Sequence, residues 1–177
     1  EILGVTPALH LHYEDEEGAV RVAQTNYPDM HSLGDVTECS ETQLRPLVRN
    51  APAISHVVHC TGPPCQQVSG LNPAGAGATG KRSGLMAIVP ELGKIFRRAF
   101  PDCKHAQLFE MVASLTRENQ VYYDKINKGK PFRICPSGLG WVRRPRLYWT
   151  TWKIRPQAHV AVEPSARWTT LHLRGTR

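Results

Sequence analysis

The 177-residue sequence lacks several features that would assign it to a specialised class of protein. No apolar run approaches the roughly 20 residues that a membrane-spanning helix needs, which argues against a membrane partner. No charged segment followed by an apolar one opens the chain, which argues against a secretory signal peptide. No internal repeat is evident, which argues against a solenoid. The sequence begins at Glu1 without an initiator methionine, so the N-terminus is expected to be a processed or truncated end.

Cysteine and histidine also lack the spacing of a disulfide-stapled or metal-bound protein. The five cysteines are scattered and contain no CxxC pair, so neither a disulfide framework nor a zinc ribbon is expected. This usage fits a reducing intracellular compartment, which would be nuclear in a eukaryote and cytoplasmic in a bacterium. The eight histidines are equally scattered, and no metal site is predicted.

What the sequence does have is an excess of positive charge. Its 22 lysines and arginines outnumber 15 aspartates and glutamates, which gives a net charge of +7. Such a balance favours a polyanionic partner. The charge is uneven, since residues 14–17 are all acidic, whereas the region from Arg143 onward is basic and contains one acidic residue, Glu163. We expect the basic region to face phosphates.

Apolar periodicity predicts alternating strands and helices. Strands are expected at residues 8–13, 32–36, 54–60, 106–112, 131–135 and 146–152. Helices are expected at residues 18–26, 41–48, 85–100 and 116–126, with a Gly/Ala/Ser-rich loop at 69–83. Ser40 is expected to open the second helix, Pro90 to kink or restart the third, and Gly129 to close the fourth. The alternation predicts an α/β fold with a mostly parallel sheet and flanking helices.

The segment Gly62-Pro63-Pro64-Cys65-Gln66 places a thiol just beyond a predicted strand, on a loop stiffened by two prolines. Ligands of open α/β sheets bind beyond the carboxyl ends of the strands. A cysteine on such a loop is a candidate nucleophile, because loop placement exposes it and local dipoles favour its thiolate. The alternative is a buried cysteine in a proline turn.

Several segments in collinear order resemble the cytosine-C5 DNA methyltransferase family, over roughly residues 3–152. They are Gly62-Pro63-Pro64-Cys65-Gln66-Gln67-Val68-Ser69, Phe109-Glu110-Met111-Val112, Arg144-Pro145-Arg146-Leu147-Tyr148-Trp149, Tyr13-Glu14-Asp15-Glu16 through Asn26-Tyr27-Pro28-Asp29, and Gly34-Asp35-Val36-Thr37. One such motif is weak, but the ordered set is specific. The resemblance implies that residues 1–153 form a partial, Rossmann-like catalytic domain that depends on S-adenosylmethionine.

The resemblance also implies roles in catalysis. Cys65 would add to C6 of a cytosine, Glu110 would protonate or hydrogen-bond its N3, and Arg146 would reach its O2. Arg144 would support the loop or contact a phosphate. The cofactor S-adenosylmethionine would supply the methyl group to C5, and the target base would have to leave the DNA duplex.

For the cofactor, the resemblance implies a second set of residues. Glu14 would bind the ribose hydroxyls, and Asp35 would accept from the adenine amino group while the backbone of Val36 donates to the ring. Pro63 and Leu85 complete the predicted cofactor-binding set.

The sequence departs from the family at three places. The family's Gly-rich cofactor loop is absent, and Glu1-Ile2-Leu3-Gly4 looks like the end of the helix that follows this loop. Residues 154–177 are expected to be a basic tail or the start of a target-recognition region. Met111 stands where the family usually has asparagine, which leaves the placement of Glu110 open.

Three other functions remain open at the level of sequence. The same cysteine and glutamate would serve a tRNA cytosine-5 methyltransferase, with RNA as the partner. The absent Gly-rich loop and the basic C-terminal region favour a catalytically silent nucleic-acid-binding module. A generic thiol enzyme would need a histidine base, for which His59 is the candidate.

Overall fold

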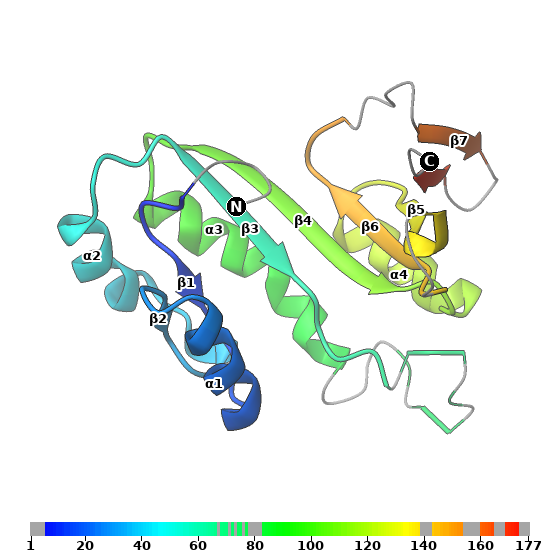
Figure 1. Ribbon diagram of the computed structural model, residues 1–177, viewed down its shortest axis with the longest axis horizontal. Coiled ribbons are helices and arrows are strands. Elements are labelled where there is room, and N and C mark those ends of the chain that lie inside the picture. The colour runs from blue at the N-terminus through cyan, green and yellow to red at the C-terminus, as the bar shows by residue number, and fades with distance from the viewer. Residues whose placement is uncertain are drawn as a thin grey trace. The chain divides into compact units, whose positions relative to one another are not determined.

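The computed structural model describes residues 6–66, 68–70, 72, 74–75, 77, 83–138, 143–153, 160–164 and 169–173. The helix end expected at Glu1–Gly4, parts of the loop at 69–83 and most of the basic tail lie outside these residues. The described part combines helices with β-sheet, which confirms the predicted α/β class (Figure 1). The chain forms two compact units, Glu1–Val57 with Glu91–His105 (unit 1) and Val58–Pro90 with Ala106–Arg177 (unit 2).

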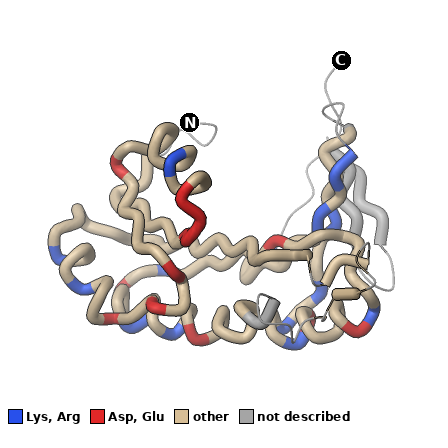
Figure 2. The backbone as a smooth tube through the Cα atoms, turned by 90° about the horizontal axis from the view of Figure 1, so that it is seen from below, with Lys and Arg blue, Asp and Glu red and all other residues tan. Residues whose placement is uncertain are grey.

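The described part of unit 1 contains short strands, three α-helices and one 3₁₀ helix. They are β1 (Leu11–His12), α1 (Glu17–Asn26), β2 (His31–Ser32), the 3₁₀ helix η1 (Val36–Glu38), α2 (Glu41–Asn50) and all but the first two residues of α3 (Val89–Ala99). β1 and β2 pair in parallel, with Leu11 opposite His31. The acidic run at residues 14–17 leads into α1 and forms a continuous charged stretch (Figure 2). The side chain of Glu16 caps this helix by accepting from the backbone of Gly18 and Ala19.

Caps decide where the elements of unit 1 end. The strand predicted for residues 32–36 stops at Ser32, so this prediction is wrong for most of its length. Asp35 instead caps η1, because its carboxylate accepts from the backbone N–H of Thr37 at 2.8 Å. Ser40 caps α2 as predicted, since its hydroxyl accepts from the backbone N–H of Gln43.

Unit 2 contains the larger sheet. Its elements are β3 (His56–Thr61), the 3₁₀ helix η3 (Ser83–Ile88), β4 (Lys104–Val112), α4 (Arg117–Ile126), β5 (Phe132–Cys135), the 3₁₀ helix η4 (Pro136–Gly138), β6 (Arg146–Thr150), β7 (Val160–Pro164) and β8 (Thr169–Leu173). The first residues of β3 and β4 belong to unit 1. The strand order of this sheet is β3-β4-β6-β5-β8-β7.

This sheet is mixed, which corrects the prediction of a mostly parallel one. β6 is antiparallel to both of its neighbours, β4 and β5, and β7 is antiparallel to β8. Because β4 and β5 both oppose β6, they run parallel to each other, and α4 makes the crossover between them. The short segment from β5 to β6 leaves no room for a second crossover helix, so β6 returns in the opposite direction.

β3 and β4 run in the same direction. At their starts, the backbone N–H of Lys104 donates to the carbonyl of Ser55 at 2.9 Å. At their ends, a Cβ added to Gly62 would lie 3.4 Å from Oε2 of Glu110. Figure 1 shows the two arrows pointing the same way. The loop that follows β3 therefore begins beside Glu110, near the end of β4.

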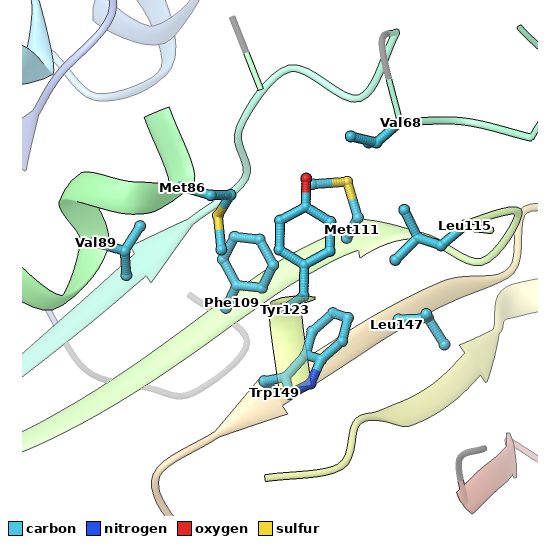
Figure 3. Packing of buried hydrophobic residues seen from close by; sticks show 9 residues of the cluster. All are labelled: Val68, Met86, Val89, Phe109, Met111, Leu115, Tyr123, Leu147 and Trp149. Carbon is cyan, nitrogen blue, oxygen red and sulfur yellow. The ribbon is translucent and has the colours of Figure 1, made fainter. Parts of the chain in front are cut away.

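The core of unit 2 lies between β4, β6, α4 and η3. The buried cluster is Val68, Met86, Val89, Phe109, Met111, Leu115, Tyr123, Leu147 and Trp149 (Figure 3). Along β4, Phe109 and Met111 are buried in this cluster, whereas Glu110 between them is only partly buried. Strand alternation therefore sends Glu110 to the opposite face of the sheet.

The predicted restart of the third helix is confirmed, and the residue predicted to close the fourth helix is wrong. α3 begins at Val89 directly after η3, so the predicted restart at Pro90 is confirmed. Proline is tolerated in a first turn because its missing N–H would have no helical partner there. α4 is closed by Lys128, which has a positive φ of 54°, and not by Gly129. Gly129 contributes its backbone N–H, which donates to the carbonyl of Asp124.

Residues 154–177 were expected to be a basic tail or the start of a target-recognition region, and two segments of this range extend the sheet. β7 and β8 form an antiparallel pair, and β8 pairs in parallel with β5, with Phe132 opposite Thr169. Backbone pairing with β5 thus accounts for part of the region predicted as a basic tail. Among the helices that the structure describes, none is both long and apolar enough to cross a bilayer.

Candidate active site

The most direct contact among the predicted catalytic residues joins Glu110 and Arg146. Nε of Arg146 lies 2.6 Å from Oε1 of Glu110, and Nη1 of Arg146 donates to the carbonyl of Pro145 at 3.0 Å. The two side chains are 32% and 19% exposed, so water screens the ion pair only in part. The two residues come from adjacent strands, since Glu110 is on β4 and Arg146 begins β6.

Strand register also brings Tyr148 to these charges. Tyr148 lies directly opposite Glu110 in the β4–β6 pair and shares a face of β6 with Arg146. Burial raises the pKa of Tyr148, the Glu110 charge raises it further, and the charges of Arg146 and Arg144 oppose the increase. Tyr148 therefore lies among three of the predicted catalytic residues. It was missed in the sequence, although its i, i+2 spacing from Arg146 was the available signal.

Cys65 follows β3 through Gly62, Pro63 and Pro64. Its carbonyl accepts from the backbone N–H groups of Val68 and Ser69, at 3.2 and 2.9 Å, so Cys65 begins a tight turn. The residue is partly exposed, and it packs against the buried cluster of unit 2. This placement lies between the two sequence interpretations, because the thiol is neither fully buried nor fully on the surface.

The Cys65 turn is anchored to the segment that follows β4. The backbone N–H of Gly70 donates to the carbonyl of Ser114 at 2.6 Å, and the hydroxyls of Ser69 and Ser114 are 3.0 Å apart. A further bridge pairs Ser69 with Leu115. At the other end of the turn, Gly62 lies beside the carboxylate of Glu110. Both ends of the loop that carries the thiol are thus held against β4.

Met111 occupies the buried face of β4 and is 1% exposed. Its side chain fills the core beside Tyr123 and Leu115 (Figure 3). The departure from asparagine therefore replaces a polar group with an apolar one inside the core, and it leaves Glu110 on the other face of the strand. The doubt about the placement of Glu110 is answered by the register of β4 against β6.

His59 is poorly suited to act as the base of a thiol enzyme. Burial lowers its pKa to about 4, so the imidazole binds a proton only weakly at neutral pH. Its Nε2 already lies 2.9 Å from the hydroxyl of Thr61. A base that deprotonates a thiol needs a higher proton affinity than this.

The basic region is only partly described. Arg143 and Arg144 are exposed, and Arg144 also donates its backbone N–H to the thiol of Cys135. The hydroxyl and backbone N–H of Ser137, and to a smaller extent the backbone N–H of Arg144, lower the pKa of the Cys135 thiol. Cys135 is the last residue of β5, and the sequence did not single it out.

The predicted cofactor carboxylates lie in unit 1, at the same edge of its parallel pair. Glu14 follows the carboxyl end of β1, and Asp35 follows that of β2. Oε1 of Glu14 accepts from the backbone N–H groups of Asp15 and Glu16, at 3.0 Å each. The backbone N–H and hydroxyl of Thr37 lower the pKa of Asp35. Fixed carboxylates at the carboxyl end of parallel strands fit a ligand with hydroxyl and amino donors.

Gln43 of α2 holds the two strand ends of unit 1. Its Oε1 accepts from the hydroxyl of Tyr13 at 2.9 Å, and its Nε2 donates to the carbonyl of Leu33 at 3.4 Å. Tyr13 immediately precedes Glu14, and Leu33 lies two residues before Asp35. Gln43 was not predicted as a site residue, because nothing in its sequence context distinguishes it from other exposed-helix glutamines.

The remaining predicted cofactor residues belong to other places in the fold. Val36 is the first residue of η1 in unit 1. Pro63 lies in the loop after β3 and Leu85 in η3, both in unit 2. The structure thus brings Cys65, Glu110, Arg144 and Arg146 into one unit, and it divides the cofactor set between the two units. The single cofactor pocket remains a prediction.

Comparison with known proteins adds no further assignment. No protein-family model matches the chain, and no curated protein matches it either. In the part of the chain that is described, no group of three or more His, Cys, Asp or Glu side chains is placed to hold a metal ion.

Proposed function

We propose that the chain carries the catalytic centre of a DNA (cytosine-5) methyltransferase that uses S-adenosylmethionine. The observation that carries this proposal is the Glu110–Arg146 ion pair, set beside the turn that leads to Cys65. A thiol, a carboxylate and a guanidinium from three separate segments of the sequence belong to one unit of the fold, and the last two form the ion pair. These are the groups that nucleophilic attack on a cytosine ring requires.

The reaction uses these groups in order. The Cys65 thiolate forms a C–S bond to C6, and the electron pair of the C5=C6 bond moves toward C5 and N3. Glu110, after taking a proton from solvent, protonates N3 or donates a hydrogen bond to it, which neutralises the developing negative charge, and Arg146 donates to O2. S-adenosylmethionine, when bound, would supply the methyl group to C5 and leave as S-adenosylhomocysteine. Water would take the C5 proton, and the electron pair of the C5–H bond would restore the C5=C6 double bond and expel the thiolate.

The ion pair sets the geometry before the base arrives. Arg146 keeps the Glu110 carboxylate from turning toward solvent, and the Pro145 carbonyl fixes the guanidinium from the other side. Two side chains held in this way lose less conformational entropy when a base binds. A flipped cytosine would replace part of the ion pair by hydrogen bonds to both residues.

The experiment is a covalent trap. The full chain is incubated with S-adenosylmethionine and a DNA duplex that contains 5-fluorocytosine. The protein is then denatured, and its mass is measured by mass spectrometry. Fluorine at C5 cannot leave as a cation, so the C–S bond persists after methyl transfer. We expect an adduct that Cys65→Ala abolishes.

The matched control is Cys135→Ala, because Cys135 is a thiol of the same unit and the hydroxyl and backbone N–H of Ser137 lower its pKa. This variant should form the adduct as the unmodified protein does. An adduct that depends on Cys135 and survives Cys65→Ala would contradict the proposal. An adduct with 5-fluorocytosine in tRNA but not in duplex DNA would reassign the substrate. A folded protein that binds DNA and forms no adduct would be the silent binding module.

A further inference from the structure

Tyr123 on α4 has a hydroxyl that the resting fold does not use. The residue is fully buried, with 0% of its surface exposed. Among the described residues, no group lies within hydrogen-bond distance of its hydroxyl oxygen. Leaving a buried hydroxyl without a partner costs about 1–3 kcal/mol. Phenylalanine would fill the same volume without this cost.

The ring of Tyr123 cannot turn its hydroxyl toward solvent. Its centroid lies 5.8 Å from that of Phe109, 6.2 Å from that of Trp149 and 5.7 Å from that of Tyr122. These neighbours hold the ring from β4, β6 and its own helix. The direction of the hydroxyl is therefore fixed by packing.

That direction is toward the turn that begins at Cys65. Figure 3 shows the hydroxyl at the end of the ring away from α4, near Val68 and the thioether of Met111. Val68 donates its backbone N–H to the carbonyl of Cys65, and both residues pack against the cluster that contains Tyr123. Burial raises the pKa of Tyr123 to about 12, and the charges of Tyr122 and Cys65 add to the increase.

The unused donor and the candidate nucleophile fit each other chemically. A thiolate accepts hydrogen bonds more strongly than a thiol, and a donor placed beside it stabilises the charged form. A phenol whose pKa is raised keeps its proton at neutral pH, so it acts as a donor and not as a base. Val68 and Met111, which also lie near the hydroxyl, are apolar and offer no acceptor as strong as a thiolate.

We propose that Tyr123 is a positioning residue that donates its hydroxyl hydrogen bond to the thiolate of Cys65. This inference rests on the proposed function, since it takes Cys65 as the nucleophile. When Cys65 ionises, its proton passes to solvent, and the hydroxyl proton stays on Tyr123. The Cys65 side chain or its turn must move to make the contact, because the hydroxyl has no partner in the resting state. The bond then holds Sγ in one direction for attack.

The test measures the reactivity of Cys65 without DNA or cofactor. The full chain and its Tyr123→Phe variant are alkylated with iodoacetamide over a range of pH, and labelling is read for each cysteine-containing peptide by mass spectrometry. We expect Tyr123→Phe to move the midpoint of the Cys65 profile up by about one pH unit, which is about a tenfold loss of thiolate at neutral pH. The profile of Cys60, which is exposed on β3, should stay where it is.

Two controls separate positioning from structure. Tyr122→Phe removes a neighbouring hydroxyl on the same helix and should leave the Cys65 profile unchanged. Tyr123→Phe should also melt at the same temperature as the unmodified protein or higher, because it removes an unpaired buried group. A Cys65 midpoint that is the same in Tyr123→Phe and in the unmodified protein would overturn the inference. Loss of folding in Tyr123→Phe would overturn it as well, since the hydroxyl would then have a partner in the resting fold.

The 5-fluorocytosine trap distinguishes this inference from the proposed function. An alkylation shift without any adduct would keep the Tyr123–Cys65 pair and reject the methyltransferase. An adduct without an alkylation shift would keep the methyltransferase and reject the role of Tyr123.

Discussion

Nε of Arg146 lies 2.6 Å from Oε1 of Glu110, although the two residues are not directly opposite each other in the sheet. Glu110 faces Tyr148, and Arg146 faces Val112, so the ion pair crosses the β4–β6 ladder on the diagonal. Long side chains reach across such a diagonal. The arrangement leaves Tyr148 beside both charges.

Removing the guanidinium should affect chemistry more than binding. We expect Arg146→Ala to lower single-turnover methyl transfer by about 10²–10³-fold, the usual cost of losing one donor to developing charge. Arg146→Lys should be intermediate, because it keeps the charge and loses the planar fork. Arg143→Ala, an exposed neighbour, serves as the control and should weaken DNA binding only. Equal losses of rate in Arg143→Ala and Arg146→Ala would contradict the role of the ion pair.

Gly70 should not tolerate a side chain. A Cβ at this position would lie 2.6 Å from the carbonyl oxygen of Ser114, which belongs to the backbone and cannot move aside cheaply. We expect Gly70→Ala to detach the Cys65 turn and to lower the free energy of unfolding by about 1–3 kcal/mol. Urea denaturation measures this change. Gly129→Ala is the matched control, because its nearest contact would be 3.9 Å away. If both variants were equally stable, the anchor at Ser114 would not hold the turn.

Gln43 should support cofactor binding from a distance. Gln43→Leu removes the two hydrogen bonds that tie Tyr13 and Leu33 to α2, at about 1 kcal/mol each. We expect weaker binding of S-adenosylmethionine in calorimetry, by about tenfold, as Glu14 and Asp35 lose their fixed positions. Gln24→Leu on the exposed side of α1 should bind as the unmodified protein does. Unchanged affinity in Gln43→Leu would count against the carboxylate pair as the cofactor site.

His59 should make the fold sensitive to acid. Its pKa is about 4 in the folded protein against an ordinary value of 6.5, so the unfolded chain takes up a proton first as the pH falls. The stability contributed by neutral His59 is present above pH 6.5, decreases as the pH falls, and is lost near pH 4. At about 1.4 kcal/mol per pH unit, the loss reaches about 3 kcal/mol at most.

Chemical denaturation between pH 7 and pH 4 measures this effect. We expect His59→Gln to flatten the decline, because glutamine does not titrate. His56→Gln, at an exposed position of the same strand, should leave the decline as it is. A decline that is equally steep in His59→Gln would place its origin in other groups.

Much of the fold was available from local sequence signals. The helix over Arg117–Ile126 and the strand over Lys104–Val112 follow from apolar spacing and from a cap at Thr116. The order of strands did not follow, since apolar periodicity does not distinguish β6 as an antiparallel strand inserted between β4 and β5. β7 and β8 were missed because their pairing with β5 is a long-range contact without a local signature.

Three residues suited to chemistry could be recognised without the fold: a cysteine after two prolines, a glutamate within an apolar strand and an arginine at the start of another. The fold was needed to show that Glu110 and Arg146 form an ion pair, that Tyr148 lies beside their charges, and that the buried Tyr123 hydroxyl has no hydrogen-bond partner among the described residues. These facts depend on strand register and on packing between segments far apart in the chain. Local sequence patterns reveal neither the register nor this packing, because both depend on which distant segments of the backbone lie next to each other.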